Sequence, residues 1–265
     1  MKNKILLFLF FLALSPSLFG SSVEDSIKQL SWSDRVSIKM FFDEAIKKDQ
    51  AAHALCFQNK PVCLTGPVLK DKHKTFKDVL CLKGWLAFKK NEHLFPHPNF
   101  IFSERLYSDN RFKCLDIYII NKKSLKECLR THFDVFKATI ASEFTSEQLI
   151  AKLEEGYPLS CLLNDDEMLL GILLGYGMES SHAFKEMRKQ CTKTFAPPPT
   201  DTYCRIDLDC PKGCKISPVV FMGNPHSPEV QQLIDIYEKE LDATWTELKQ
   251  SRNSLKMVLE KLCGE

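Results

Sequence analysis

A short apolar run near the start of the chain decides which residues can take part in the fold. Lys2 and Lys4 precede an unbroken apolar stretch at 5–14, and small residues follow at 20–22. This order is typical of a secretory signal peptide, whereas a membrane-spanning helix needs about 20 apolar residues. We therefore predict a cleaved signal peptide at 1–22, with an uncleaved anchor as the alternative. The mature chain is expected in the periplasm, in the outer envelope or as a secreted protein, with no stable transmembrane span.

The predicted mature chain carries no net charge, which argues against nucleic acid as a partner. The full sequence has 36 basic and 34 acidic residues, and the predicted signal peptide contains two lysines and no acidic residue. A neutral chain has no overall field that attracts a polyanion. Lysines are locally in excess at 60–90, where either a solvated surface or a basic patch is the interpretation. The candidate basic patch consists of Lys70, Lys72, Lys74 and Lys77.

Eleven cysteines follow the predicted signal peptide, and their number is odd. Clustered cysteines of an exported protein usually form disulfides, and an odd number leaves at least one thiol free or paired with another chain. The disulfide candidates are Cys191, Cys204, Cys210 and Cys214, whose connectivity the spacing leaves open. The last three of these thiols also suit zinc or copper(I) as a metal alternative, or redox chemistry. No cofactor is expected.

Helical periodicity dominates the mature sequence and predicts a mainly α fold. We predict helices at 32–57, 76–89, 124–136, 145–156, 164–176, 180–190, 227–250 and 255–262. Of these, 76–89 mixes apolar and polar residues without a clear period. Two runs, at 99–103 and 112–120, are instead rich in β-branched and aromatic residues. They predict a small β-hairpin that turns at 108–110.

The segment at 168–176 is apolar on nearly all sides, so we expect it to form the buried centre of its domain. Gly171 and Gly175 lie four residues apart within it and predict a close crossing with another helix. Three consecutive prolines follow at 197–199. The mature chain is accordingly divided into a helical core domain at 23–195, a Cys/Pro-rich loop at 196–226 and C-terminal helices at 227–265. The loop has no apolar period, so a disulfide or a metal is expected to order it.

No catalytic motif is recognisable in the sequence, which lacks a nucleophile elbow, a zinc-protease motif and a phosphate-binding glycine loop. His93 and His97 are four residues apart, as are Cys128 and His132, and this spacing places two ligands on one face of a helix. Apolar residues surround the second pair, so a packed core position is the preferred interpretation. The first pair flanks a turn, where half a metal site is the alternative.

The chain contains the segments ALCFQNKPV at 54–62, IINKK at 119–123 and LGILLGYG at 170–177. Together these segments resemble uncharacterised exported proteins of chlamydia-like intracellular bacteria, over 35–260 of the chain. The resemblance implies an envelope or host-interface setting. It implies no activity, cofactor or catalytic residue.

These features favour an exported, non-catalytic envelope or secreted protein that binds another macromolecule, with an unknown protein as its partner. The lack of a catalytic motif is the reason for this interpretation. The alternative is a thiol-based metal carrier or redox protein that uses the loop from Cys204 to Cys214, for which the clustered thiols are the reason.

Overall fold

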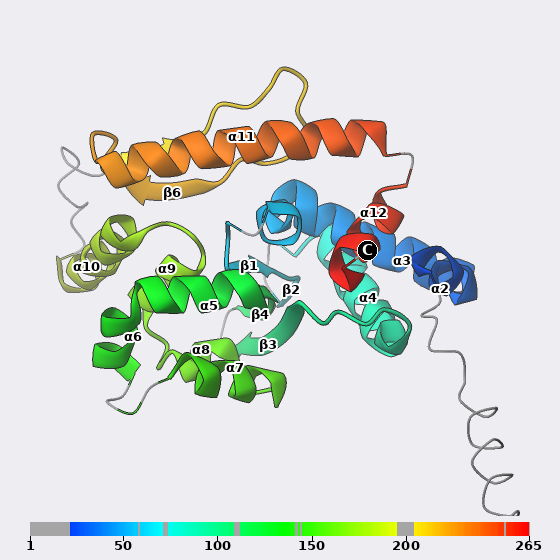
Figure 1. Ribbon diagram of the computed structural model, residues 1–265, viewed down its shortest axis with the longest axis horizontal. Helices are drawn as coiled ribbons and strands as arrows, with labels where there is room; N and C mark the ends of the chain where they lie inside the picture. The colour runs from blue at the N-terminus through cyan, green and yellow to red at the C-terminus, as the bar shows by residue number, and fades with distance from the viewer. Residues whose placement is uncertain are drawn as a thin grey trace, which may run out of the picture.

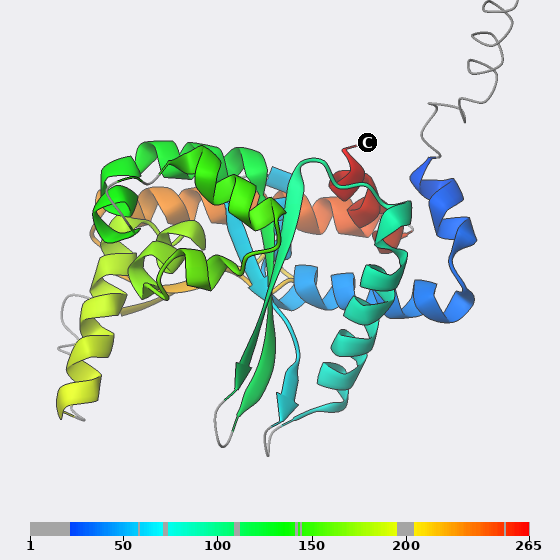
Figure 2. The same cartoon turned by 90° about the horizontal axis from the view of Figure 1, so that it is seen from below.

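A small antiparallel sheet lies at the centre of the fold, with helices on both of its faces (Figure 1, Figure 2). The computed structural model describes residues 22–57, 59–70, 74–108, 112–140, 143, 145–194, 204–251 and 253–264. Strand β4 (Lys113–Asn121) pairs along its whole length with β3 (Phe100–Ser108). Its other edge pairs with β1 (Val62–Thr65) and then with β2 (Val68–Lys70). A bend at Gly66 separates β1 from β2.

The side chains of β4 alternate between two hydrophobic cores. Ile117 and Ile119 belong to the first core, and Tyr118 and Ile120 belong to the second. All four are at most 2% exposed. Because both faces of this strand are covered, its sequence is a continuous apolar run and not the alternation of a half-exposed strand. Strand β4 is therefore a wall that the two cores share.

The first core lies between the sheet and helices from both ends of the described chain. These helices are α2 (Val23–Gln29), α3 (Trp32–Lys48), the π-helix η1 (His53–Phe57), α4 (Phe76–Asn91), the 3₁₀-helix η2 (Glu92–Leu94) and α12 (Ser254–Cys263). The ring centroid of Trp85 lies 5.2 Å from that of Phe41 and 5.6 Å from that of Phe88. Such offset aromatic contacts add to the free energy gained by burying the rings.

The second core covers the opposite face of the sheet. Its helices are α5 (Lys122–Thr131), α6 (Phe133–Ile140), α7 (Ser146–Glu154), α8 (Leu159–Leu162) and α9 (Glu167–Leu173). Helix α9 ends in a Schellman motif, in which the N–H of Tyr176 donates to the carbonyl of Gly171 and the N–H of Gly175 donates to that of Ile172. Gly175 has a φ of +78°, which favours glycine at this position. Helix α10 (Met178–Thr194) then packs beside α9.

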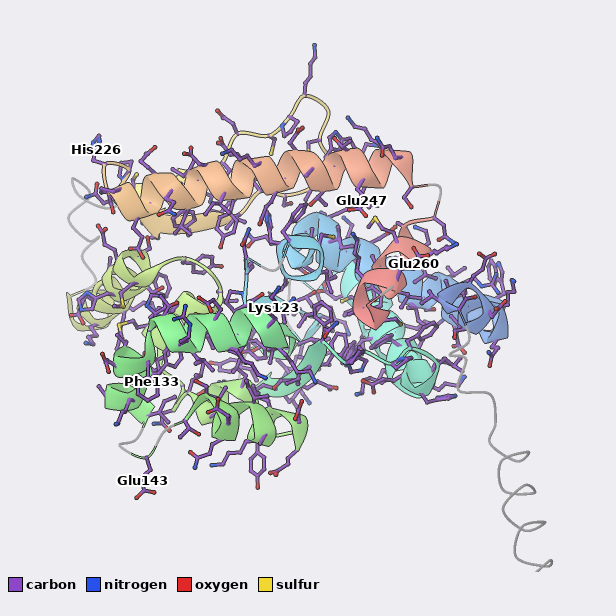
Figure 3. The ribbon with its side chains drawn as sticks, in the orientation of Figure 1. Lys123, Phe133, Glu143, His226, Glu247 and Glu260 are labelled. Atoms are coloured by element: carbon purple, nitrogen blue, oxygen red, sulfur yellow. The ribbon has the colours of Figure 1, made fainter. Side chains whose placement is uncertain are left out.

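A third, smaller cluster joins a two-stranded sheet to the longest helix described. Strands β5 (Cys204–Asp207) and β6 (Val220–Gly223) pair antiparallel, and α11 (Pro228–Gln250) packs against them. Helix α11 runs along the molecule from β6 towards α12 (Figure 1). Near its end, Glu247 pairs with Lys261 of α12 at 3.1 Å, and Figure 3 shows where Glu247 lies. Helix α11 thus connects the third cluster with the first core.

Helix α11 caps the N-terminus of α10. The carboxylate of Glu229, in the first turn of α11, accepts hydrogen bonds from the N–H groups of Met178 and Glu179 at 2.8 and 3.0 Å. In return, the hydroxyl of Ser227 donates to the carboxylate of Glu179. Carboxylates also interact favourably with the positive end of a helix dipole. The cap and the side-chain hydrogen bond fix the starts of the two helices side by side.

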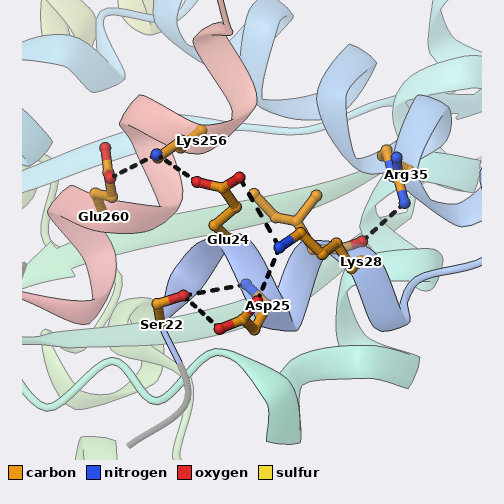
Figure 4. A network of polar contacts seen from close by, with 8 residues as sticks. Ser22, Glu24, Asp25, Lys28, Arg35, Lys256 and Glu260 are labelled. Carbon is orange, nitrogen blue, oxygen red and sulfur yellow. Dashed lines mark hydrogen bonds and ion pairs between the residues drawn. The ribbon is translucent and has the colours of Figure 1, made fainter.

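The first described helix is tied to the last one by a surface network (Figure 4). Ser22 caps α2 by accepting from the N–H of Asp25, whose carboxylate pairs with Lys28 at 2.9 Å. Lys256 of α12 pairs with Glu24 of α2 at 2.9 Å. Exposed ion pairs stabilise weakly, so the apolar contacts of α2 with α12 hold the two ends of the described chain together.

The prediction of a mainly α fold with a small β-hairpin is confirmed. Helix α4 covers the segment without a clear period, and the predicted helix at 32–57 is divided by Gln50, whose φ is +64°. The expectation of a loop without regular structure at 196–226 is wrong, because β5 and β6 lie there. The buried centre is β4 and not the segment at 168–176, and α12 belongs to the first core. No helix within the described ranges is long and apolar enough to span a membrane.

Candidate functional site

An apolar pocket of about 480 Å³ lies between α9, α10 and the β5–β6 sheet. Its lining residues are Glu167, Leu170, Gly171, Leu174, Tyr176, Ser180, Ser181, Phe184, Arg205, Val220, Phe221 and Met222. Most of these side chains are aliphatic or aromatic. A pocket of this size and composition is typical of a binding site for a small molecule or for the side chains of a partner. We refer to it as the apolar pocket.

Two close contacts give the apolar pocket its shape. A Cβ atom on Gly171 of α9 would lie 2.6 Å from the hydroxyl oxygen of Ser181, so glycine is needed for α10 to approach this closely. On the other wall, the rings of Tyr176 and Phe221 stack with their centroids 6.0 Å apart. The predicted close helix crossing is therefore present at Gly171. Gly175 has a different role, since it lies beyond the end of α9.

The charged side chains around the apolar pocket are paired with one another. Glu167 forms an ion pair with Arg188 at 2.9 Å, and the Arg205 guanidinium donates to Asp207 at 2.8 Å. Both arginine charges are therefore already balanced by a carboxylate. The pocket therefore suits an uncharged, apolar group more than a carboxylate or a phosphate.

Tyr176 connects the apolar pocket with a buried lysine. The ammonium group of Lys60 lies 5.4 Å from the centroid of the Tyr176 ring and donates to the side-chain carbonyl of Gln50. Lys60 is only 1% exposed. Burial removes the water that stabilises its charge, and lowers its pKa to about 8. The cation–π contact and the amide are the partners that compensate for this loss of water.

A buried polar cluster lies near Lys60, where η1 meets α11. The Glu240 carboxylate accepts from His53 Nδ1 at 2.6 Å and also from the side-chain amide of Asn59. His53 and Glu240 are 1% and 5% exposed. The Tyr237 hydroxyl donates to the carbonyl of Gly175 at 2.6 Å, and its ring lies 5.1 Å from that of His53. This cluster links α11, η1 and the end of α9.

A shallower groove of about 410 Å³ passes between α5 and α11 and reaches Asn59 and Tyr237 of the buried cluster. Cys128 and His132 lie in its wall, as their spacing on one helix face predicts. Burial lowers the pKa of His132 and raises that of Cys128 to about 12. Since the thiolate is the reactive form of cysteine, Cys128 is a protonated thiol at neutral pH and a poor nucleophile. Cys128 packs against the second core, as the sequence indicated, whereas His132 is half-buried beyond the end of α5.

The cysteines of the predicted loop are free thiols in the structure. Cys204 begins β5, and Cys210 and Cys214 lie in the turn between the strands, close enough for Cys214 to add to burial in raising the pKa of Cys210. The side chain of Cys191, on α10, is outside the described part of the chain. None of the predicted disulfides is seen among the ten described cysteines, and no cluster of three or more metal-ligating side chains occurs there.

Packing orders the segment between β5 and β6, contrary to the expectation that only a disulfide or a metal would do so. Leu208, Ile216 and Val219 are at most 5% exposed. The N–H of Ser217 donates to the carbonyl of Lys47 at the end of α3, at 2.6 Å. The segment is therefore attached to the first core as well as to α11. Apolar residues without helical or strand spacing supply this contact, which periodicity does not reveal.

The predicted basic patch is spread along one end of the molecule. Lys70 ends β2, and Lys74 and Lys77 are exposed at the start of α4. Lys72 lies outside the described residues. The proposed histidine pair is not a metal site, because His97 contacts the carboxylate of Glu92 and the carbonyl of Phe100.

Sequence reasoning missed the buried cluster because its members are far apart in the chain. His53 and Glu240 are 187 positions apart, and Glu240 occurs in a helix with many other charged residues. The one available signal was its place on the apolar stripe of α11, since Tyr237, Leu241 and Thr244 on the same side are all buried.

Known proteins offer no guide to this site. Comparisons of the chain with protein-family models, with curated protein sequences and with solved structures found no match.

Proposed function

We propose that the protein is an exported, non-catalytic binding protein that holds apolar side chains of a partner protein in the apolar pocket. The observation that carries the proposal is the pocket itself, a preformed cavity of about 480 Å³ with aromatic walls and a rim of mutually paired charges. Interfaces gain most of their affinity from a few apolar anchors that enter such pockets.

The position of β6 favours a peptide segment over a small molecule. Val220, Phe221 and Met222 of β6 line the pocket, and the sheet that contains them has two strands. A strand that is paired on one side has unpaired backbone groups on its other side. An extended segment of a partner protein is able to use such an edge for main-chain hydrogen bonds and to place alternate side chains into the pocket.

A selection of phage-displayed peptides on the purified protein tests this proposal. The selected peptides should carry aliphatic or aromatic anchors. Met222→Trp, which fills the pocket, should weaken their binding by about tenfold or more, as expected for the loss of a buried anchor. Met40→Trp is the matched control, because Met40 is exposed on α3 and does not line the pocket. Peptides that bind Met222→Trp as tightly as the wild type, or a failure to select any peptide, would contradict the proposal.

Export is supported by the position of the first described helix. Val23 begins α2, and Ser22, the last residue of the predicted signal peptide, caps this helix. Cleavage between Gly20 and Val23 leaves all described helices and strands intact. N-terminal sequencing of the exported protein should find a start within this interval. A protein that begins at Met1 in an exported sample would contradict cleavage.

The thiol-based alternative rests on the proximity of Cys210 and Cys214. Both thiols lie in the turn between β5 and β6, and the pKa of Cys210 is raised by burial and by Cys214, which opposes thiolate chemistry at neutral pH. For the proposed binding protein we expect the same number of free thiols with and without reductant, in line with the free thiols of the structure, and no bound metal. Bound zinc or copper that stabilises the chain would instead support the metal carrier.

A further inference from the structure

Helix α4 has an apolar face that the described fold leaves uncovered. Its inward face, with Trp85 and Phe88, is buried in the first core. Its outward face carries Phe76, Val79 and Leu86, which are 75%, 44% and 58% exposed. These three positions lie within about 80° of one another around the helix at 100° per residue. The second apolar face is the reason why the sequence of α4 has no clear period.

Two more exposed apolar side chains lie at the adjacent end of the sheet. Leu106 and Tyr107, near the end of β3, are exposed. Tyr107 and Val68 of β2 both pair with Cys114, so they flank β4 at the same level. The N–H of Val68 donates to the Asp78 carboxylate of α4 at 3.0 Å, which ties the first turn of α4 to this end. Figure 2 shows the β3–β4 hairpin and the start of α4 projecting to the same side.

Lysines surround these apolar side chains. The exposed lysines of β2, of the residues just before α4 and of the first half of α4 are Lys70, Lys74, Lys77 and Lys83. Within the part of the chain that the structure describes, these four form no ion pair. The acidic residues nearby within the described ranges include Asp78, which is engaged in the cap of α4, Glu104 of β3 and Asp116 of β4. We call the exposed apolar residues of α4 and β3, together with these four lysines, the lysine-rich tip.

We propose that the lysine-rich tip binds the surface of an anionic lipid bilayer. Its apolar side chains project from a helix face and a strand end, a shape that suits insertion below the lipid headgroups. A lysine has a long apolar stem that lies along the acyl chains while its ammonium group reaches the phosphates. Apolar residues next to basic ones are the composition of surface-bound membrane segments. The tip is separate from the apolar pocket, so the failure of one proposal would leave the other unaffected.

Co-sedimentation with vesicles tests the proposal. The mature protein is mixed with phosphatidylcholine vesicles that contain or lack phosphatidylglycerol. The test variants are Phe76→Ser with Leu106→Ser, and Lys74→Glu with Lys77→Glu. Their matched controls are Tyr157→Ser and Lys212→Glu, which change exposed residues outside the tip. All substituted side chains are exposed, and circular dichroism checks that every variant is folded.

The wild type and both controls should bind the anionic vesicles and not the neutral ones. Each lysine removed should weaken binding about fivefold, and salt should weaken it further. The apolar variant should also lose binding. The proposal is overturned by a lack of binding, by equal binding to neutral vesicles, or by an apolar variant that binds like the wild type.

A second measurement detects insertion directly. Phe76→Trp should be quenched by anionic vesicles with brominated acyl chains, whereas Tyr157→Trp should show only the quenching of the wild-type tryptophans. Equal quenching of the two variants would mean that another face meets the lipid. If the tip binds no lipid while the selected peptides lose affinity for Phe76→Ser, its occupant is a protein.

Discussion

Glu240 is the residue at which three segments of the chain meet. Its carboxylate lies on α11, and its partners are His53 in η1 and Asn59, which precedes β1. A buried carboxylate is expensive unless every oxygen has a partner, and here both oxygens are used. The value of this cluster therefore lies in specificity of packing: it defines which face of α11 approaches η1.

Removal of the Glu240 carboxylate should be costly. In Glu240→Ala, His53 stays buried without its acceptor, and we expect a loss of about 3–5 kcal/mol in the free energy of unfolding. Asp242→Ala, on an exposed position of the same helix, should change it by less than about 0.5 kcal/mol. Urea unfolding of both variants measures the difference. Equal stabilities would show that the cluster is solvated and not buried.

Lys60 should make stability depend on pH in the alkaline range. Its pKa is lowered to about 8 in the folded chain, against about 10.4 for an unperturbed lysine. Between these values the unfolded chain binds more protons, so this group makes stability rise as the pH rises from 8 towards 10.4. The destabilisation that the buried charge of Lys60 causes is fully present below pH 8, and it is absent above the pKa of lysine in the unfolded chain.

Lys60→Met keeps the apolar stem and removes the titrating group. The variant should be at least as stable as the wild type at pH 7, because it buries no charge. The difference between the two proteins should shrink as the pH rises through the window given above. Urea midpoints at several pH values measure this, and an identical pH dependence of both proteins would contradict it.

The turn at the end of α9 determines how closely α11 can approach. Gly175 has a φ of +78°, and a Cβ atom there would lie 2.2 Å from the Tyr237 hydroxyl. Gly156, beyond the end of α7, has a φ of +90° and an open surrounding. Substitutions at these two glycines therefore distinguish the cost of a strained backbone from the cost of a steric clash.

Gly156→Ala should lose about 1–2 kcal/mol from the left-handed backbone alone. Gly175→Ala should lose a further 1–3 kcal/mol, by about the usual cost of overpacking, because the buried Tyr237 has no room to retreat. Thermal unfolding of both variants, with midpoints converted to free energies, gives the comparison. Equal losses would mean that Tyr237 moves aside without cost.

Elements with a long apolar stripe were predictable from the sequence, and short strands were not. Helix α11 shows its stripe over many turns, and its start at Pro228 has a strong sequence signal. Strands β1, β5 and β6 have four residues each, too few to show an alternation. The apolar pocket could not be predicted from the sequence either, because it depends on which faces of α9, α10 and β6 stay uncovered after packing.

At the scale of the whole molecule, the two large cores should unfold together, because both rest on β4. Tryptophan fluorescence offers a test: the three tryptophans are Trp32, Trp85 and Trp245, and none belongs to the second core. Leu159→Ala, in the second core, should lower stability by about 2–5 kcal/mol. Its fluorescence and circular dichroism transitions should shift by the same amount. A fluorescence transition that stays in place would show that the cores unfold separately.

The cap that α11 provides for α10 has a consequence for the chain between them. Met178 and Glu229 are 51 positions apart and lie in direct contact, so the chain from α10 to the start of α11 forms a closed loop. Each doubling of the length of such a closed loop costs only about 0.6 kcal/mol in closure entropy. Insertions at the exposed turn near Gly213 should therefore leave α11 in register. The exposed turn near Gly213 is thus a place at which the length of this loop can change without moving the start of α11.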